Sequence, residues 1–449
     1  MEKVSRSNYE MYDIQNKSEG INFSQLAILA FVFYIFTQGW LFYLIIQNNF
    51  IEISVLLIIT STLLFKSLIN NLPDLTFTLL DALWSFSIIV ILVLISISGF
   101  KENDVLIFMY VFGLLFLLLA KTDINNFDIA FKVIKYAAIV YALSSIFHYL
   151  FTETYHSIVF PFISSSAQQR VLELVNLNYF AGLGLSQPSL AAGPMIMGIG
   201  MALAQLNSGE NQNKKLNIII ILLLILSLLI AGKRSVLIWG GISVVVTQLL
   251  IATGKKKIEK IVKYAFAILI LIGTTYVLWG FLQNVPILAK VVETIQGIDT
   301  GEDVTSGRVV LYQRAWELFL ENPIFGIGWG QFVVVTTGLL ARDLVVHNVY
   351  LQLLSETGLI GFIIIIIPII YAYFLTIKCY KVIKNNPLIN GKWKLGLIFS
   401  IYYQTFFLLY CLTENPFYNV VYLFMFFFCL AIVNSLIVLK LKKSDYYEV

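Results

Sequence analysis

The chain has 449 residues, of which 59% are hydrophobic and 12% are charged, and its formal net charge is +4. Soluble domains carry about 45–50% apolar and about 25% charged residues, so this composition excludes an ordinary soluble protein. The positive charge forms no basic stripe outside the predicted loops, and we therefore expect no nucleic-acid partner.

Long apolar runs recur along the whole chain, for example at 218–231 and 359–377. Crossing the hydrocarbon core takes about 20 mostly apolar residues, so each long run predicts a membrane-spanning helix. The predicted fold class is all-α: a polytopic membrane protein with 1–449 as a single integral membrane domain. We expect about a dozen spans. They are placed at 25–46, 52–70, 77–98, 104–120, 130–150, 187–206, 217–231, 236–252, 263–281, 349–377, 394–412 and 417–439.

Lysine and arginine predict the orientation, because cytoplasmic loops are enriched in both. With the N-terminus inside, the inner connections hold most of the 30 Lys and Arg residues. We therefore expect a multi-pass protein of the cell membrane with both termini in the cytoplasm. Inside, almost all of these residues are lysine, whereas arginine predominates outside. The residues expected outside are Lys101, Arg170, Lys233, Arg234, Lys290, Arg308, Arg314 and Arg342.

Two of the expected outer segments are long, at 151–186 and 282–347, and the functional site should lie there. The second loop contains a helix that Thr305 or Ser306 can cap and that runs to about residue 321. It stops at Asn322-Pro323. Its expected apolar face would lie along the membrane surface. That face consists of Val309, Tyr312, Trp316 and Phe319.

The stretch from Ser306 to Gly361 carries a set of recognisable motifs. It reads SGRVVLYQRAWELFLENPIFGIGWGQF and, after a gap, HNVYLQLLSETGLIG. This combination resembles the O-antigen ligase and polymerase superfamily of bacterial membrane glycosyltransferases. The shared pattern is Ser-Gly-Arg, a following Trp, Asn-Pro-x-x-Gly-x-Gly, His-Asn-x-Tyr-Leu and Glu-x-Gly. The stretch 178–194 is similar to an earlier, less conserved segment of that family.

The resemblance implies a GT-C-like, lipid-linked glycosyltransferase with a large outer loop carrying amphipathic helices. Such enzymes transfer a glycan from undecaprenyl diphosphate to an acceptor hydroxyl at the outer face, without a cofactor or metal. The implied partners are the lipid-linked donor, the acceptor, the bilayer and a chain-length regulator protein.

Four basic residues are candidates for binding the donor's diphosphate. Arg234 follows the span 217–231, and the family carries an arginine there; Lys233 precedes it. Arg308 opens the predicted loop helix, where free amides already favour an anion. A guanidinium binds phosphate oxygens in a bidentate fork. Arg314 is the fourth candidate, although Glu317 lies at a local pairing distance.

His347 heads the His-Asn motif, and the family uses this histidine in catalysis. We expect it to act as the general base, with Asn348 in a supporting structural role. Glu356 lies inside a predicted span, nine residues from His347. That spacing is about half a turn around the helix. Glu356 should therefore face away from His347 and serve as a structural hydrogen-bond acceptor.

No metal site is predicted, although acidic side chains at 299–303 could bind a hard cation through oxygen. The expected reaction is an inverting, metal-independent polymerisation of undecaprenyl-diphosphate-linked repeat units into capsule or O-antigen polysaccharide. A ligase that transfers the glycan to lipid A core, protein or a wall polymer is the main alternative. A transporter of lipid-linked glycans is a third, but it should show ionisable residues at the midplane or paired broken helices.

Overall fold

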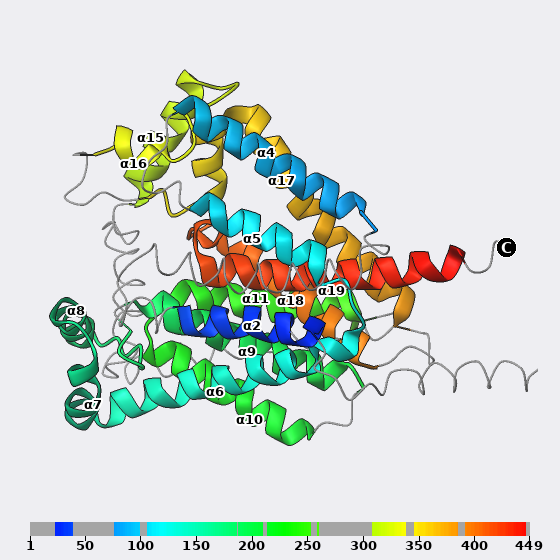
Figure 1. Cartoon of the computed structure of the whole chain (residues 1–449). Helices are drawn as coiled ribbons and strands as arrows, with labels where there is room; N and C mark the ends of the chain where they lie inside the picture. Colours follow the sequence, from blue (N-terminus) through cyan, green and yellow to red (C-terminus); the bar gives the residue numbers. More distant parts are fainter. Residues whose placement is uncertain are drawn as a thin grey trace, which may run out of the picture.

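The structure is a computed structural model that describes residues 23–38, 76–98, 106–185, 187–209, 213–252, 258–259, 308–337, 345–384 and 391–445. Every regular element within these ranges is a helix (Figure 1). The predicted all-α class is thus confirmed for this part of the chain. The N-terminal half contains α2 (Phe23–Thr37), α4 (Leu79–Ser98), α5 (Leu106–Leu119), α6 (Asp128–Leu150), α7 (Thr152–Val159), α8 (Ser165–Asn176), α9 (Pro188–Asn207) and α10 (Lys214–Ile230). The C-terminal half contains α11 (Arg234–Ile251), α15 (Arg308–Glu321), α16 (Gln331–Val335), α17 (Val349–Ile383), α18 (Gly391–Tyr410) and α19 (Val420–Asp445). Short 3-10 turns are η4 (Ile124–Phe127), η5 (Phe160–Phe162) and η7 (Pro416–Tyr418).

Six of the described helices are long and apolar enough to cross a membrane. The chain is therefore a polytopic membrane protein. Other expected spans correspond to shorter or less apolar helices, such as α5 and α10, and those at 52–70 and 263–281 lie outside the described residues. The full number of about a dozen stays a prediction. The six spans are Leu79–Ile97, Ile124–Leu150, Pro188–Asn207, Arg234–Ile251, Val349–Ile383 and Val420–Leu439.

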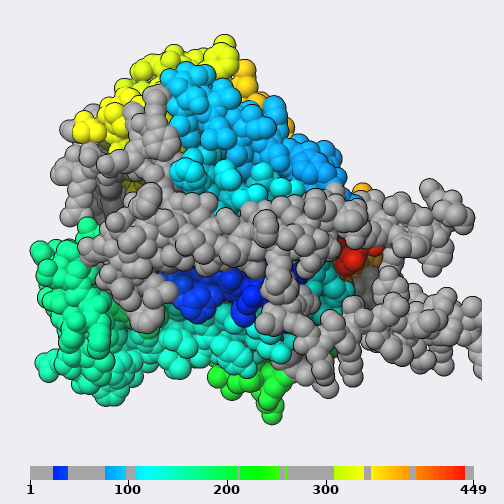
Figure 2. All heavy atoms as spheres, viewed as in Figure 1, coloured from blue at the N-terminus to red at the C-terminus, as the bar shows by residue number. Residues whose placement is uncertain are grey.

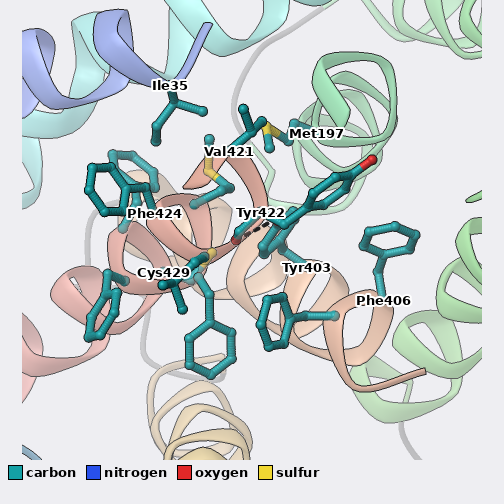
Figure 3. Close-up of a cluster of buried hydrophobic side chains, with 14 of the residues drawn as sticks. Ile35, Met197, Tyr403, Phe406, Val421, Tyr422, Phe424 and Cys429 are labelled. Carbon is teal, nitrogen blue, oxygen red and sulfur yellow. Dashed lines mark hydrogen bonds between the residues drawn. The ribbon is translucent and has the colours of Figure 1, made fainter. Parts of the chain in front are cut away.

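Two helices, α9 and α19, lie at the centre of the bundle. In the most apolar 18-residue stretch of each, 89% of the residues are buried. In α9, small residues let neighbouring helices approach closely, as is usual between membrane helices. An added Cβ at Gly200 would lie 2.3 Å from the ring of Tyr402 on α18. In α19, large aromatic side chains fill the space instead. Figure 3 shows Phe424, Tyr422 and their neighbours, with the Tyr403 hydroxyl donating to the Tyr422 carbonyl at 2.9 Å.

The helices of the two long connections gather at one end of the bundle, which we call the site end. Figure 1 shows α7, α8, α15 and α16 at this end, whereas α19 finishes at the other. The space-filling view places α7–α8 and α15–α16 on the same side of the molecule (Figure 2). The opposite end is held by a buried ion pair between Asp81 and Lys121, with Asn434 donating to Asp81. The two ends therefore carry distinct sets of charged side chains.

The amphipathic helix predicted in the second long loop is α15, and it ends at Glu321, directly before Asn322-Pro323 as expected. Its face of Val309, Tyr312, Trp316 and Phe319 was predicted to lie along the membrane surface, and this stays a prediction; the side packed against the protein is a second apolar row. Leu311, Ala315 and Leu318 are the buried residues that face α17 and α16, whereas Trp316 is 47% exposed. Apolar side chains occupy two rows of this helix, and the row with the smaller residues fits against the neighbouring helix. Val309 also stays exposed, and Tyr312 and Phe319 are half-buried.

Helix α17 was predicted as one continuous helix, but it is interrupted at Gly358, which has φ 62° and ψ −171°. The segment 323–328 fills the interruption. Ile327 and Gly328 donate their amides to the carbonyls of Ser355 and Glu356, and Leu359 donates to the carbonyl of Pro323, all at 2.8–2.9 Å. Backbone groups freed by the interruption are thus paired, as they must be inside a membrane protein.

Candidate active site

Four side chains from distant parts of the chain meet at the site end. Lys233 precedes α11, Arg308 begins α15, His347 precedes α17, and Glu414 lies in the turn between α18 and α19. Glu414 joins the other three. Its Oε1 accepts from Lys233 Nζ at 2.6 Å and from Arg308 Nη2 at 3.1 Å, while His347 Nδ1 lies 3.1 Å from Oε2. The arrangement places two cations and one imidazole around a single carboxylate.

Glu414 is mostly enclosed, with 11% of its side chain exposed. Burial by itself raises the pKa of this carboxyl. The hydrogen bond from His347 and the charges of Lys233 and Arg308 outweigh burial and lower the pKa to about 2. Glu414 is therefore ionised at any ordinary assay pH, and it can only accept hydrogen bonds.

The turn that carries Glu414 is held by three neighbouring elements. Arg308 Nη1 donates to the carbonyl of Thr413 at 2.8 Å, and Trp239 Nε1 of α11 donates to the Thr413 hydroxyl at 2.8 Å. Asn348 Nδ2 donates to the Leu412 carbonyl at 3.1 Å. Asn348 also caps α17, because its Oδ1 accepts the amide of Leu351. Asn348 thus ties the start of α17 to the turn that carries Glu414.

His347 has a left-handed backbone conformation, with φ 55°. A non-glycine residue in this region is uncommon, and such conformations often cluster at functional sites. The Tyr312 hydroxyl of α15 donates to the His347 carbonyl at 3.3 Å. About a quarter of the His347 side chain is exposed, as are similar fractions of Lys233 and Arg308. Lys233, Arg308 and His347 are therefore held by contacts within the protein and remain accessible to a ligand.

Two further residues have their own partners away from this group, Arg314 and His156. Arg314 pairs with Glu317 at 3.0 Å and with Glu321 at 3.4 Å on its own helix. His156 Nε2 of α7 lies 3.3 Å from His148 Nε2 of α6. Arg234 follows Lys233 as the first residue of α11 and is half-buried. The structure thus brings together Lys233, Arg308 and His347, with Arg234 adjacent in the chain.

Glu356 is fully buried beside the interruption of α17 and away from His347. Its Oε1 accepts from Gln352 Nε2 at 3.2 Å and from the Phe332 amide at 3.4 Å, and its Oε2 accepts from the Tyr418 hydroxyl at 3.2 Å. Asn415 donates to Gln352 at 2.8 Å, so this network reaches the residue after Glu414. Glu356 thus accepts hydrogen bonds from α17, α16 and η7.

The sequence reasoning missed Glu414, which was read as part of a short connection. One signal could have found it: Glu414 is the only acidic residue between Glu356 and Asp445. A lone charge at the end of an apolar span is costly unless it has a partner. Metal-binding clusters of three or more His, Cys, Asp or Glu side chains are absent from the described ranges. The acidic stretch 299–303 lies outside them.

Together, the fold and the site define a polytopic all-α membrane protein with a cation–imidazole–carboxylate group at one end of its bundle. Residues 219–366, about a third of the chain, match the profile of the O-antigen ligase family. This match confirms the resemblance to the O-antigen ligase and polymerase superfamily. It includes Lys233, Arg308, His347 and Glu356, but Glu414 lies beyond its end. Among curated proteins, no sequence matches the chain.

Proposed function

We propose that the protein is a glycosyltransferase that polymerises undecaprenyl-diphosphate-linked oligosaccharide repeat units into capsule or O-antigen polysaccharide. The observation that carries this proposal is the meeting of Lys233, Arg308 and His347 within a few ångströms of Glu414. The family match supports a glycosyltransferase-like enzyme of polysaccharide assembly. Lys233 and Arg308 come together at one end of the bundle, which suits group transfer at a membrane face better than passage through the bilayer.

The donor's diphosphate would bind to the two cations. Arg308 has five N–H donors and Lys233 has three, and their contacts with Thr413, Tyr312 and Glu414 engage only part of that number. Arg234, one residue along, would add a second guanidinium. As the bond from the anomeric carbon to phosphate breaks, the electron pair passes to the diphosphate, and these cations stabilise the growing charge.

His347 would serve the acceptor. It takes the proton of the attacking sugar hydroxyl as general base while that oxygen bonds to the anomeric carbon. A diphosphate leaves as a stable anion and needs no acid. A single displacement of this kind inverts the anomeric configuration. No step requires a metal ion, since arginine and lysine supply the positive charge.

The decisive experiment uses the purified protein in proteoliposomes with undecaprenyl-diphosphate-linked repeat units as donor and acceptor. We expect lipid-linked products of two or more repeats, formed equally well in the presence of EDTA. A ligase would instead extend only a lipid A core, protein or wall acceptor. A transporter would move the lipid across the bilayer and form no new glycosidic bond. Loss of transfer with EDTA, restored by magnesium or manganese, would contradict the metal-free mechanism.

The proposed orientation puts both termini in the cytoplasm and the site end outside. The motivating observation is the excess of lysine in the predicted inner connections. A membrane-impermeant maleimide applied to intact cells should label Glu302→Cys and should not label Lys257→Cys until the membrane is permeabilised. The matched background is Cys379→Ser, because Cys379 is half-buried whereas Cys411 and Cys429 are buried. Labelling in the reverse pattern would overturn the topology.

A further inference from the structure

The two oxygens of Glu414 have different partners. Oε1 lies between Lys233 Nζ and Arg308 Nη2, whereas Oε2 lies 3.1 Å from His347 Nδ1. A carboxylate used only to neutralise the cations would need no contact with the imidazole. The division means that one side chain contacts both the cation pair and the candidate base.

The contact with Oε2 selects one form of the imidazole. An ionised carboxylate has no proton to donate, so Nδ1 must carry the proton and donate it. In the neutral ring, the lone pair is then on Nε2. When Nε2 takes up a proton, the resulting positive charge lies beside the Glu414 carboxylate. A base needs both of these features, and an unpaired histidine has neither of them secured.

The Glu414 carboxylate is held firmly enough to select the tautomer of His347. The turn around it receives hydrogen bonds from α11 through Trp239, from α15 through Arg308, and from α17 through Asn348. The amide of Val349, two residues after His347, donates to the Cys411 carbonyl at 2.9 Å. The backbones that carry His347 and Glu414 are thus joined directly, so their relative placement does not depend on long side chains alone.

We propose that Glu414 is a positioning residue that holds His347 in the Nδ1-protonated form, so that Nε2 accepts the proton of the attacking hydroxyl. This inference rests on the proposed function. The acceptor's O–H proton passes to Nε2, its oxygen forms the bond to the anomeric carbon, and the diphosphate departs with the electron pair. The imidazolium then returns its proton to water, and Glu414 itself stays ionised throughout.

The test is Glu414→Gln. The two cations require an oxygen beside them, so the amide nitrogen of glutamine would face His347 Nδ1. That nitrogen is a donor, and it would move the imidazole proton to Nε2, where it blocks the base. We expect turnover to fall about 10²–10⁴-fold, the range for loss of a general base or of its correct tautomer. Donor-lipid binding should be unchanged or tighter, because the cations lose their internal anion.

A purely structural role for Glu414 would lower donor binding and turnover together. Thermal unfolding of each purified variant separates folding from chemistry. If Glu414→Gln does not fold, Glu414→Asp keeps the charge and withdraws the carboxylate by one methylene; its loss should again be in turnover alone. Glu173→Gln, an exposed carboxylate of α8, is the matched control and should behave as the parent.

A double-mutant comparison decides the matter. If Glu414 acts through His347, Glu414→Gln should lower turnover no further in a His347→Ala background. Additive losses, or joint loss of donor binding and turnover, would overturn the inference. The outcomes also separate it from the proposed function. If His347→Ala retains full transfer, the proposed base is wrong; if only Glu414→Gln retains full transfer, the positioning role alone is wrong.

Discussion

Replacing His347 with alanine should lower glycan transfer about 10²–10⁴-fold, the usual contribution of a general base. Donor-lipid binding should remain close to that of the parent, because the diphosphate would be held by Lys233, Arg308 and Arg234. The measurement is donor binding and transfer for the same purified preparation. His156→Ala is the control, since His156 of α7 lies beside His148 of α6 rather than beside Glu414.

Changing Arg308 should produce the opposite pattern. Arg308→Lys keeps the charge but loses the planar fork and the paired contacts to Thr413 and Glu414. Donor binding should weaken about 10- to 100-fold, corresponding to loss of hydrogen bonds to a charged group. Some turnover should remain at saturating donor. If His347→Ala abolishes donor binding while Arg308→Lys does not affect it, the two roles have been assigned the wrong way round.

Replacing Gly326 with alanine should unfold the region that supports the site. Gly326 has φ 69°, and an added Cβ would lie 2.4 Å from the carbonyl carbon of Glu356. The backbones at Gly326 and Glu356 cannot move apart without breaking the hydrogen bonds between the segment 323–328 and α17. We expect a loss of more than about 3 kcal/mol in the free energy of unfolding, because both the conformation and the space exclude a side chain.

The matched control for this prediction is Gly241→Ala in α11, where an added Cβ meets nothing within 4 Å. Alanine there should leave stability unchanged or raise it by about 0.5–1 kcal/mol, the usual difference in a helix interior. Thermal and denaturant unfolding in detergent, with limited proteolysis of the segment 323–335, are the measurements. A Gly326→Ala protein as stable as the parent would show that the loop does not pack into α17.

The sequence alone predicted the membrane class and most of the described helices. These depend on hydrophobicity summed over about 20 neighbouring residues, which tertiary contacts scarcely change. The end of α15 could also be predicted, because the residue before a proline disfavours helical backbone and Asn322-Pro323 therefore ends the helix. Lys233, Arg308 and His347 were all candidates before the structure was known, on the strength of motif and charge type.

The sequence could not predict which of two neighbouring cations, Lys233 or Arg234, contacts Glu414. Arg234 was the stronger candidate for the donor's diphosphate, which stays a prediction, whereas the contact between Lys233 and Glu414 was not predicted. Periodicity likewise could not decide which apolar row of α15 is buried, because two rows satisfy the same helical spacing. That choice depends on the shape of the surface that α15 meets, and Leu311, Ala315 and Leu318 fit it better than Val309 and Trp316 do.

Only the tertiary structure revealed the partner of these charges. Glu414 lies 181 residues from Lys233, 106 from Arg308 and 67 from His347. The interruption of α17 at Gly358 also depends on a segment some 30 residues earlier that enters it. Local hydrophobicity determines that a segment spans the membrane, because its free energy is a sum over neighbours in the chain. The pairing of a buried charge depends on which helix ends meet in space, and that is a property of the packed bundle as a whole.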